Sequence, residues 1–113
     1  MKLDKLSRMK KGWFIGNFEP ACVRTKHFEV AYKKHKRREF WPWHHQKEAT
    51  EINLLVRGHL KLKFPFKKDV QLKPGTIFIF PPKEAAKPIF LTNCELVVIK
   101  IPSLPKDKVQ FKL

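Results

Sequence analysis

Residues 41–58 read WPWHHQKEATEINLLVRG, and the order of polar and apolar positions in this stretch decides the fold. Side chains alternate between the two faces of an extended chain, so His44 and Gln46 should share one face while His45 points to the other. Glu51 opens an apolar run shortly after Gln46. A strand, a short bend and a second strand would bring His44, Gln46 and Glu51 together at the mouth of a barrel.

Short strand patterns continue on both sides of this stretch and are separated by turn signals. In the first of them, Phe28, Val30 and Tyr32 occupy alternate positions and are predicted to share one face. Pro74-Gly75 predicts a turn, and Pro81-Pro82 ends a strand. The predicted strands cover residues 27–34, 51–57, 59–64, 76–80, 88–92 and 94–101. Many short strands without a sustained helical stripe indicate an all-β sandwich or barrel.

The length of 113 residues suits one domain. We expect a basic N-terminal arm over residues 1–11, a barrel over 12–108 and a short C-terminal tail over 109–113. The chain starts with charged residues, lacks a secretory apolar segment, and has no stretch near the roughly 20 apolar residues of a membrane helix. We therefore expect a soluble cytoplasmic protein with no membrane partner, in which Cys22 and Cys94 are reduced thiols.

The spacing His44-x-Gln46, four residues, Glu51, six residues, Gly58 resembles the first motif of the cupin superfamily, with Gln46 in place of the second histidine. A wider resemblance, covering about residues 12–108, is to small, uncharacterised cupin-domain proteins of bacteria and phages. It is carried by residues 12–20, 47–52 and 97–103. The resemblance implies a double-stranded β-helix, or jelly-roll barrel, which is usually dimeric and often holds Fe, Mn, Ni or Zn. Cupins include isomerases, epimerases, dioxygenases and decarboxylases, as well as members without catalysis.

The second cupin motif, Gly, five residues, Pro-x-Gly, two residues, His, three residues, Asn, is only partly present. Gly75 and Pro81 fit it, but Lys83, Ala86 and Phe90 stand where its Gly, His and Asn belong. No histidine follows His59, so the usual set of three histidines and one glutamate is incomplete.

Only weak candidates for metal ligands remain, namely His44, Gln46 and Glu51. A neutral amide is a poor transition-metal ligand, and catalytic zinc sites usually keep three protein ligands. The sequence therefore predicts a degenerate metal site, and a divalent metal is less expected than a metal-free pocket.

A small-molecule pocket is the first functional interpretation. Aromatic and polar residues clustered at a barrel mouth are typical of ligand sites, and here they are His44, Gln46, Glu51, Trp41 and Trp43. The two tryptophans suggest stacking on a sugar ring or a base, and packing is the alternative for at least one of them. A carbohydrate ligand is suggested by the family resemblance alone.

The sequence leaves open whether the protein is an enzyme. If it is, His44 or Glu51 is a candidate general base, since a buried carboxylate beside a histidine can have its pKa moved towards neutrality. Tyr32, the only tyrosine, is a candidate proton donor if it faces inward.

The net charge of +15 supports an alternative function. A field of that size attracts polyanions such as nucleic acid, and the densest basic run holds Lys33, Lys34, Lys36, Arg37 and Arg38. The excess is mostly lysine scattered along the chain, which is also typical of a solvated surface. The alternatives are therefore a non-catalytic polyanion-binding protein or an accessory dimerisation protein.

Residues 52–56 predict an assembly. Ile52, Leu54 and Val56 lie on one face of the strand, but Leu55 on the other face is apolar as well. A sheet with one face in water would alternate more cleanly. We therefore expect a homodimer in which a second subunit covers the outer face.

Overall fold

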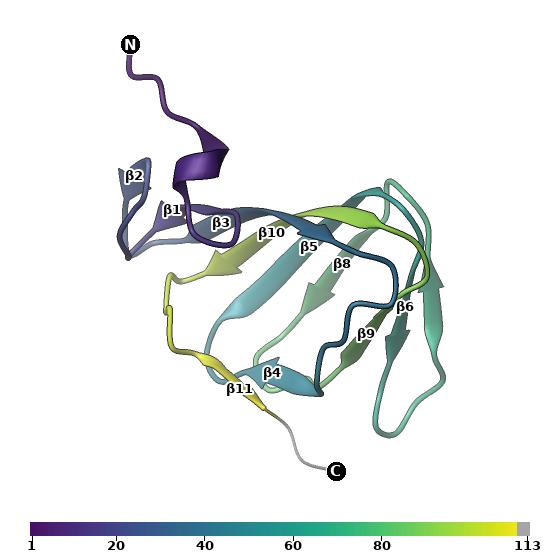
Figure 1. Cartoon of the computed structure of the whole chain (residues 1–113). Coiled ribbons are helices and arrows are strands. Elements are labelled where there is room, and N and C mark those ends of the chain that lie inside the picture. The colour runs from purple at the N-terminus through teal and green to yellow at the C-terminus, as the bar shows by residue number, and fades with distance from the viewer. Residues whose placement is uncertain (111–113) are drawn as a thin grey trace.

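The computed structural model describes residues 1–110, where strands arranged as a barrel account for most of the regular structure (Figure 1). One short 3-10 helix, η1, spans Leu6–Arg8. The strands are β1 (Trp13–Gly16), β2 (Val23–Arg24), β3 (Glu29–His35), β4 (His44–Gln46), β5 (Thr50–Arg57), β6 (Leu60–Lys63), β7 (Val70–Leu72), β8 (Ile77–Phe80), β9 (Lys87–Phe90), β10 (Cys94–Ile101) and β11 (Lys108–Gln110). No helix within residues 1–110 is long and apolar enough to cross a bilayer.

Two sheets face each other across the interior (Figure 1). The larger sheet has the strand order β2-β1-β3-β10-β5-β8, and the smaller has the order β7-β6-β9. β4 and β11 pair with each other and lie at the lower end of the barrel in Figure 1. Apart from the parallel pair β1–β2, neighbouring strands are antiparallel. This arrangement confirms the predicted all-β fold class.

The interior is polar at one end and apolar at the other. Along β5 the inward residues run from Glu51 through Asn53 to Leu55, and along the antiparallel β10 they run from Leu96 to Lys100. Lys100 lies opposite Glu51 and Leu96 lies opposite Leu55, so polar residues pair at one end of the two strands and apolar residues at the other. The apolar end is the hydrophobic core, formed by Ala31, Leu55, Leu60, Leu62, Leu72, Phe90, Cys94, Leu96 and Val98.

The apolar face of β3 points outward. Val30 and Tyr32 share that face as predicted, where Val30 pairs with Ile99 and Tyr32 pairs with Val97. The inward positions are Glu29, Ala31, Lys33 and His35. Hydrophobicity alone does not identify the inward face of β3, because Glu29, Lys33 and His35 line a cavity while only Ala31 joins the hydrophobic core.

Segments near both ends of the described part of the chain contact the barrel. Lys108–Gln110 form β11, which pairs with all three residues of β4, so the boundary expected at residue 108 falls inside a strand. Residues 111–113 of the expected tail lie outside the described residues. In the expected N-terminal arm, Met9 is buried and Lys10 forms a β-bridge with Trp13.

Candidate functional site

β4 and the start of β5 bring three of the predicted site residues to one cavity. His44 and Gln46 come from β4 and Glu51 from β5, and all three line a cavity of about 610 Å³ inside the barrel. The Gln46 amide donates from Nε2 to Glu51 Oε1 at 3.4 Å. Asn53 Nδ2 donates to the other oxygen of Glu51 at 3.1 Å. The predicted strand, bend and strand geometry is therefore present, and it surrounds Glu51 with amide donors.

Hydrogen bonds to main-chain groups of Pro42 and Ala86 fix the position of His44. Its Nδ1 lies 3.1 Å from the Pro42 carbonyl, which makes Nδ1 the protonated nitrogen of the ring. Burial lowers the pKa of His44, so the imidazole is neutral at pH 7. The His44 main chain exchanges two hydrogen bonds with Ala86, at 3.2 and 3.1 Å. Ala86 is the position where the second cupin motif has its histidine, so a methyl group stands beside His44 at that place.

Trp41 lines the cavity, whereas Trp43 is not among the described residues that do so. The Trp41 indole N–H donates to Glu39 Oε2 at 2.7 Å, and its ring lies 5.5 Å from the His35 ring and 6.0 Å from the His44 ring, measured between centroids. His45 also contributes to the cavity lining, although alternation along β4 had placed it on the opposite face.

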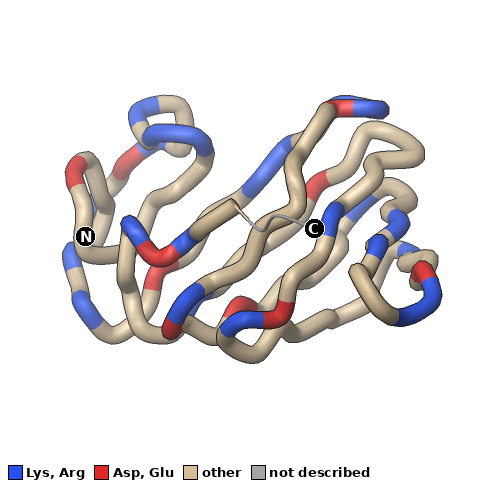
Figure 2. The backbone as a smooth tube through the Cα atoms, turned by 90° about the horizontal axis from the view of Figure 1, so that it is seen from below, with Lys and Arg blue, Asp and Glu red and all other residues tan. Residues whose placement is uncertain are grey.

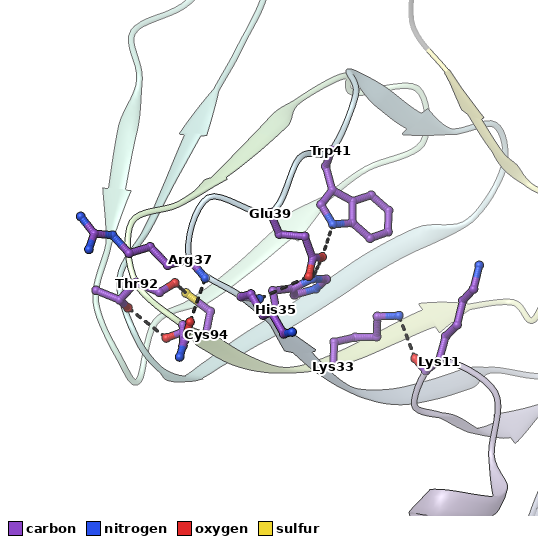
Figure 3. A network of polar contacts seen from close by, with 10 residues as sticks. Lys11, Lys33, His35, Arg37, Glu39, Trp41, Thr92 and Cys94 are labelled. Carbon is purple, nitrogen blue, oxygen red and sulfur yellow. Dashed lines mark hydrogen bonds and ion pairs between the residues drawn. The ribbon is translucent and has the colours of Figure 1, made fainter.

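His35 belongs to the site although its sequence position suggested a solvent-facing residue. Its ring stacks on Phe90 at a centroid distance of 4.3 Å and lines the cavity. Burial lowers the pKa of His35, so the neutral ring donates from Nδ1 to Glu39 Oε2 at 2.6 Å. Figure 3 shows Glu39 between His35 and Trp41, where it holds both rings at the cavity wall. In the sequence, His35 could have been recognised because it occupies the same alternate positions of the strand as Ala31 and Lys33.

The Glu39 carboxylate predicts a pH-dependent stability. Burial alone would raise its pKa, but hydrogen bonds from His35, Trp41 and the Lys36 N–H bring it down to about 2, below the ordinary 4.5. Ionised Glu39 therefore stabilises the fold above about pH 4.5, and this contribution is lost as pH falls towards 2. We expect Glu39→Gln to destabilise the protein by about 1–2 kcal/mol at pH 7 and by progressively less below pH 4.5.

Urea unfolding followed by tryptophan fluorescence at pH 7, 4 and 2.5 measures this difference. Glu19→Gln is the matched control, because the Glu19 side chain is 81% exposed and pairs with Arg24 at the surface. It should change stability by less than about 0.5 kcal/mol. A Glu39→Gln effect that stays constant from pH 7 to 2.5 would contradict the role assigned to the carboxylate.

Tyr32 is not placed at the cavity. It lies on the outer face of β3, where its hydroxyl donates to Glu95 Oε1 at 2.6 Å. That hydrogen bond raises the pKa of Tyr32. Tyr32 is therefore separated from His44 and Glu51 by the sheet itself, and the proposed proton-donor role does not fit this geometry.

The basic run divides between two faces. Lys34, Lys36, Arg37 and Arg38 are exposed, whereas Lys33 points into the barrel and donates to the Lys11 carbonyl at 2.7 Å (Figure 3). Two more lysines at the cavity were not predicted: Lys100 inside the barrel, on the same face of β10 as Leu96 and Val98, and Lys108 at the exposed rim. Figure 2 shows Lys and Arg positions distributed over strands and loops on several sides of the chain.

No protein-family model matches the chain, and no curated protein matches it either. Solved structures do match in fold. A cupin-2 domain protein from Shewanella frigidimarina has 18% identity and a TM-score of 0.60, covering 68% of this chain and 72% of its own. A double-stranded β-helix protein from Klebsiella pneumoniae has 13% identity and a TM-score of 0.70, with 81% of each chain covered.

The DMSP lyase DddQ from Ruegeria pomeroyi is similar over a larger part of this chain. It has 16% identity and a TM-score of 0.72, and the match covers 85% of this chain but 48% of the lyase. Identities this low support a common architecture and leave substrate and partners open. The strand order, the position of the cavity and these structural likenesses together show that the chain has the double-stranded β-helix fold of the cupin superfamily.

Proposed function

We propose that this protein binds a small molecule inside its barrel. The observation that carries the proposal is the cavity of about 610 Å³, which falls within the roughly 300–1,000 Å³ range of ligand pockets. Its wall combines the Trp41 indole with a small group of polar side chains around Glu51. Sugar hydroxyls would suit this group, since carboxylate and amide groups offer both acceptors and donors. A carbohydrate is therefore one ligand class to test.

We further propose that the metal site of the barrel is degenerate. Within residues 1–110, no three His, Cys, Asp or Glu side chains form a group that could hold a metal ion. Gln46 turns its NH2 group towards Glu51, and Ala86 offers only a methyl group beside His44. This donor set does not fit the three histidines and one glutamate implied by the cupin motifs.

Elemental analysis of protein purified with Fe, Mn, Ni and Zn present tests the metal proposal. We expect much less than one metal per chain and no change in melting temperature after dialysis against a chelator. Stoichiometric metal that His44→Ala abolishes would overturn it.

Ligand binding is tested by screening sugars, sugar phosphates and small organic acids against labelled protein by NMR. The expected result is a set of amide shifts confined to the segments that line the cavity, with β3, β4, β5, β10 and β11 among them. Amides of β7 serve as the internal control, because no β7 residue is among the described residues lining the cavity. If no compound shifts the cavity amides, the small-molecule proposal fails.

Polyanion binding is the second candidate function. It is supported by the exposure of Lys34, Lys36, Arg37 and Arg38 around the end of β3. Phosphate contacts should weaken steeply between about 50 and 200 mM salt. Gel shifts with DNA and RNA at both salt concentrations test this role, and the absence of any shift at low salt would remove it.

We also propose that the protein is a homodimer joined through the outer face of the large sheet. That face carries Ile52, Leu54, Ile77, Ile79, Val97 and Ile99, which pair across β10, β5 and β8. Ile79 is 58% exposed, and charged residues are absent from this central set. Each chain carries a net charge of +15, so two copies repel each other through their charged surfaces. Contact through this uncharged face keeps the lysines and arginines of the two copies apart.

Light scattering at rising protein concentration measures the oligomeric state. We expect a dimer for the native chain and a monomer for Ile79→Glu. Val70→Glu, on exposed β7 of the other sheet, should remain dimeric. A native chain that stays monomeric at high concentration would contradict the homodimer.

A further inference from the structure

Three lysines from three strands converge on the cavity. Lys33 comes from β3, Lys100 from β10 and Lys108 from β11, and all three line the same space. Lys100 is only 7% exposed, whereas Lys108 lies at the rim and remains accessible to solvent. Isolated lysines are among the residues least often found inside proteins without a partner, so three at one cavity require an explanation.

Carboxylates lie near these lysines without pairing directly with them. Within residues 1–110, none of the three ammonium groups takes part in an ion pair. Glu29 lies opposite Lys100 on the sheet, but it accepts hydrogen bonds from the Leu104 N–H at 2.9 Å and the Ser103 hydroxyl at 3.4 Å. Glu51, on the other side of Lys100, accepts hydrogen bonds from two side-chain amides.

The remaining acidic residues at the cavity pair at its rim. Glu19 binds Arg24 at 2.8 Å, and Glu84 binds Lys67 at 3.2 Å. The cavity lining therefore keeps more ammonium groups than carboxylates able to neutralise them.

The lysines also repel one another. Burial and the neighbouring charges of Lys11 and Lys100 lower the pKa of Lys33. Burial, followed by the charge of Lys100, lowers the pKa of Lys108 to about 8. An anion placed among these groups would relieve the repulsion and favour the protonated form of each amine.

Within residues 1–110, the three ammonium groups contact neutral groups only: Lys33 Nζ donates to the Lys11 carbonyl at 2.7 Å and lies 6.0 Å from the centre of the Trp13 ring, and the other two lie over tryptophan rings. Lys108 Nζ lies 4.0 Å from the centre of the Trp41 ring, and Lys100 Nζ lies 4.9 Å from the centre of the Trp13 ring. A ring face attracts a cation without cancelling its charge, so the ammonium groups remain available to an anion. The rings also exclude water from one side of the site, which strengthens charge interactions there.

One acceptor in the cavity also lacks a donor. Gln46 Oε1 is buried and has no hydrogen-bond partner, and the whole residue is 4% exposed. A buried acceptor left without a donor destabilises the structure around it. A ligand hydroxyl or amide N–H next to the anionic group would satisfy it.

We infer that the cavity binds a small organic anion, a carboxylate or a phosphate monoester, whose charged group lies among Lys33, Lys100 and Lys108. The apolar part of such a ligand would pack on the Phe and Leu side chains that line the cavity, and a donor group would reach Gln46 Oε1. This inference rests on the proposed small-molecule function and specifies the chemical class of the ligand.

Four aromatic probes of similar shape test it by calorimetry and tryptophan fluorescence. Benzoate and phenyl phosphate are anionic, benzamide is neutral and benzamidine is cationic. We expect the two anions to bind and the other two to bind at least about tenfold more weakly. Lys33→Met and Lys108→Met should each weaken the anions about tenfold or more, because a hydrogen bond to a charged group is lost.

Each variant has a matched control. Lys34→Met removes the same charge from the neighbouring exposed position of β3, and Lys106→Met removes it from an exposed residue just before β11. Both controls should bind within about twofold of the native chain. Lys108→Arg should retain most of the affinity because it keeps the positive charge. Melting curves establish that every variant is folded. Of the three lysines, Lys108 lies at the exposed rim, so its substitution should disturb the fold least.

The outcomes separate this inference from the function on which it rests. If no probe of any charge binds, small-molecule binding itself fails and the anion site fails with it. If benzamide binds as tightly as benzoate, or if the Lys33 and Lys108 variants match their controls, the pocket stands but the anion site is overturned.

Discussion

Gly58→Ala is expected to lower the free energy of unfolding by about 2–5 kcal/mol. Gly58 directly follows β5 and has φ +93°, a conformation that costs an L-residue about 1–2 kcal/mol. A Cβ there would lie 2.2 Å from the Asn93 carbonyl oxygen and 2.8 Å from Cys94 Sγ. Relieving these overlaps would displace the turn before β10, and overpacking of this kind costs a further 1–3 kcal/mol or so.

Gly75→Ala is the matched control for this prediction. Gly75 has nearly the same backbone angle, φ +90°, but a Cβ at that position meets nothing within 4 Å. Its replacement should cost only the conformational part, about 1–2 kcal/mol. Urea unfolding of both variants isolates the steric part as their difference. Equal losses at the two glycines would show that the close approach to Asn93 is not what requires Gly58.

Asp107→Ala should destabilise the protein by about 2–4 kcal/mol. The carboxylate is 5% exposed and accepts the N–H groups of Glu48, at 3.0 Å to each oxygen, and Ala49, at 2.9 Å. Ala49 is fully buried, so removing the acceptor leaves its N–H without a partner or water. Each lost charge-assisted bond of this kind contributes about 1.5–3 kcal/mol. The bend held in this way is the one that places Gln46 and Glu51 together.

Two further variants establish whether the Asp107 effect is local. Asp107→Asn retains one acceptor oxygen and should lose about half as much stability. Asp69→Ala removes the same charge from an exposed position and should stay within about 0.5 kcal/mol of the native chain. If Asp69→Ala were as damaging as Asp107→Ala, the loss would reflect net charge and not the bend between β4 and β5.

The longer strands could be predicted from sequence because their apolar residues alternate or cluster. The strand expected at 94–101 coincides with β10, and that expected at 51–57 differs from β5 by one residue. β7 and β11 have only three residues each, too few for a pattern to emerge. β11 is also defined by its partner β4, and pairing between distant segments has no local signature.

The candidate site was only partly accessible from sequence. Motif spacing located His44, Gln46 and Glu51, because a family resemblance reports backbone positions. It could not locate Lys100 or Lys108, since a lysine in an alternating strand is normally assigned to solvent. Tyr32 was a candidate only on the condition that it faces inward, and local alternation does not decide which face of a strand is the inner one; in the structure Tyr32 faces outward.

The contrast between the two ends of the barrel interior affects how such a protein can change over time. On β5 and β10, Leu55 and Leu96 belong to the hydrophobic core at one end of the barrel, and Glu51 and Lys100 lie at the other end. Substitutions at the polar end would therefore alter what the barrel accepts with little loss of stability. Homologous proteins could therefore change their ligand by substitution at single inward positions of the polar end while keeping the same fold.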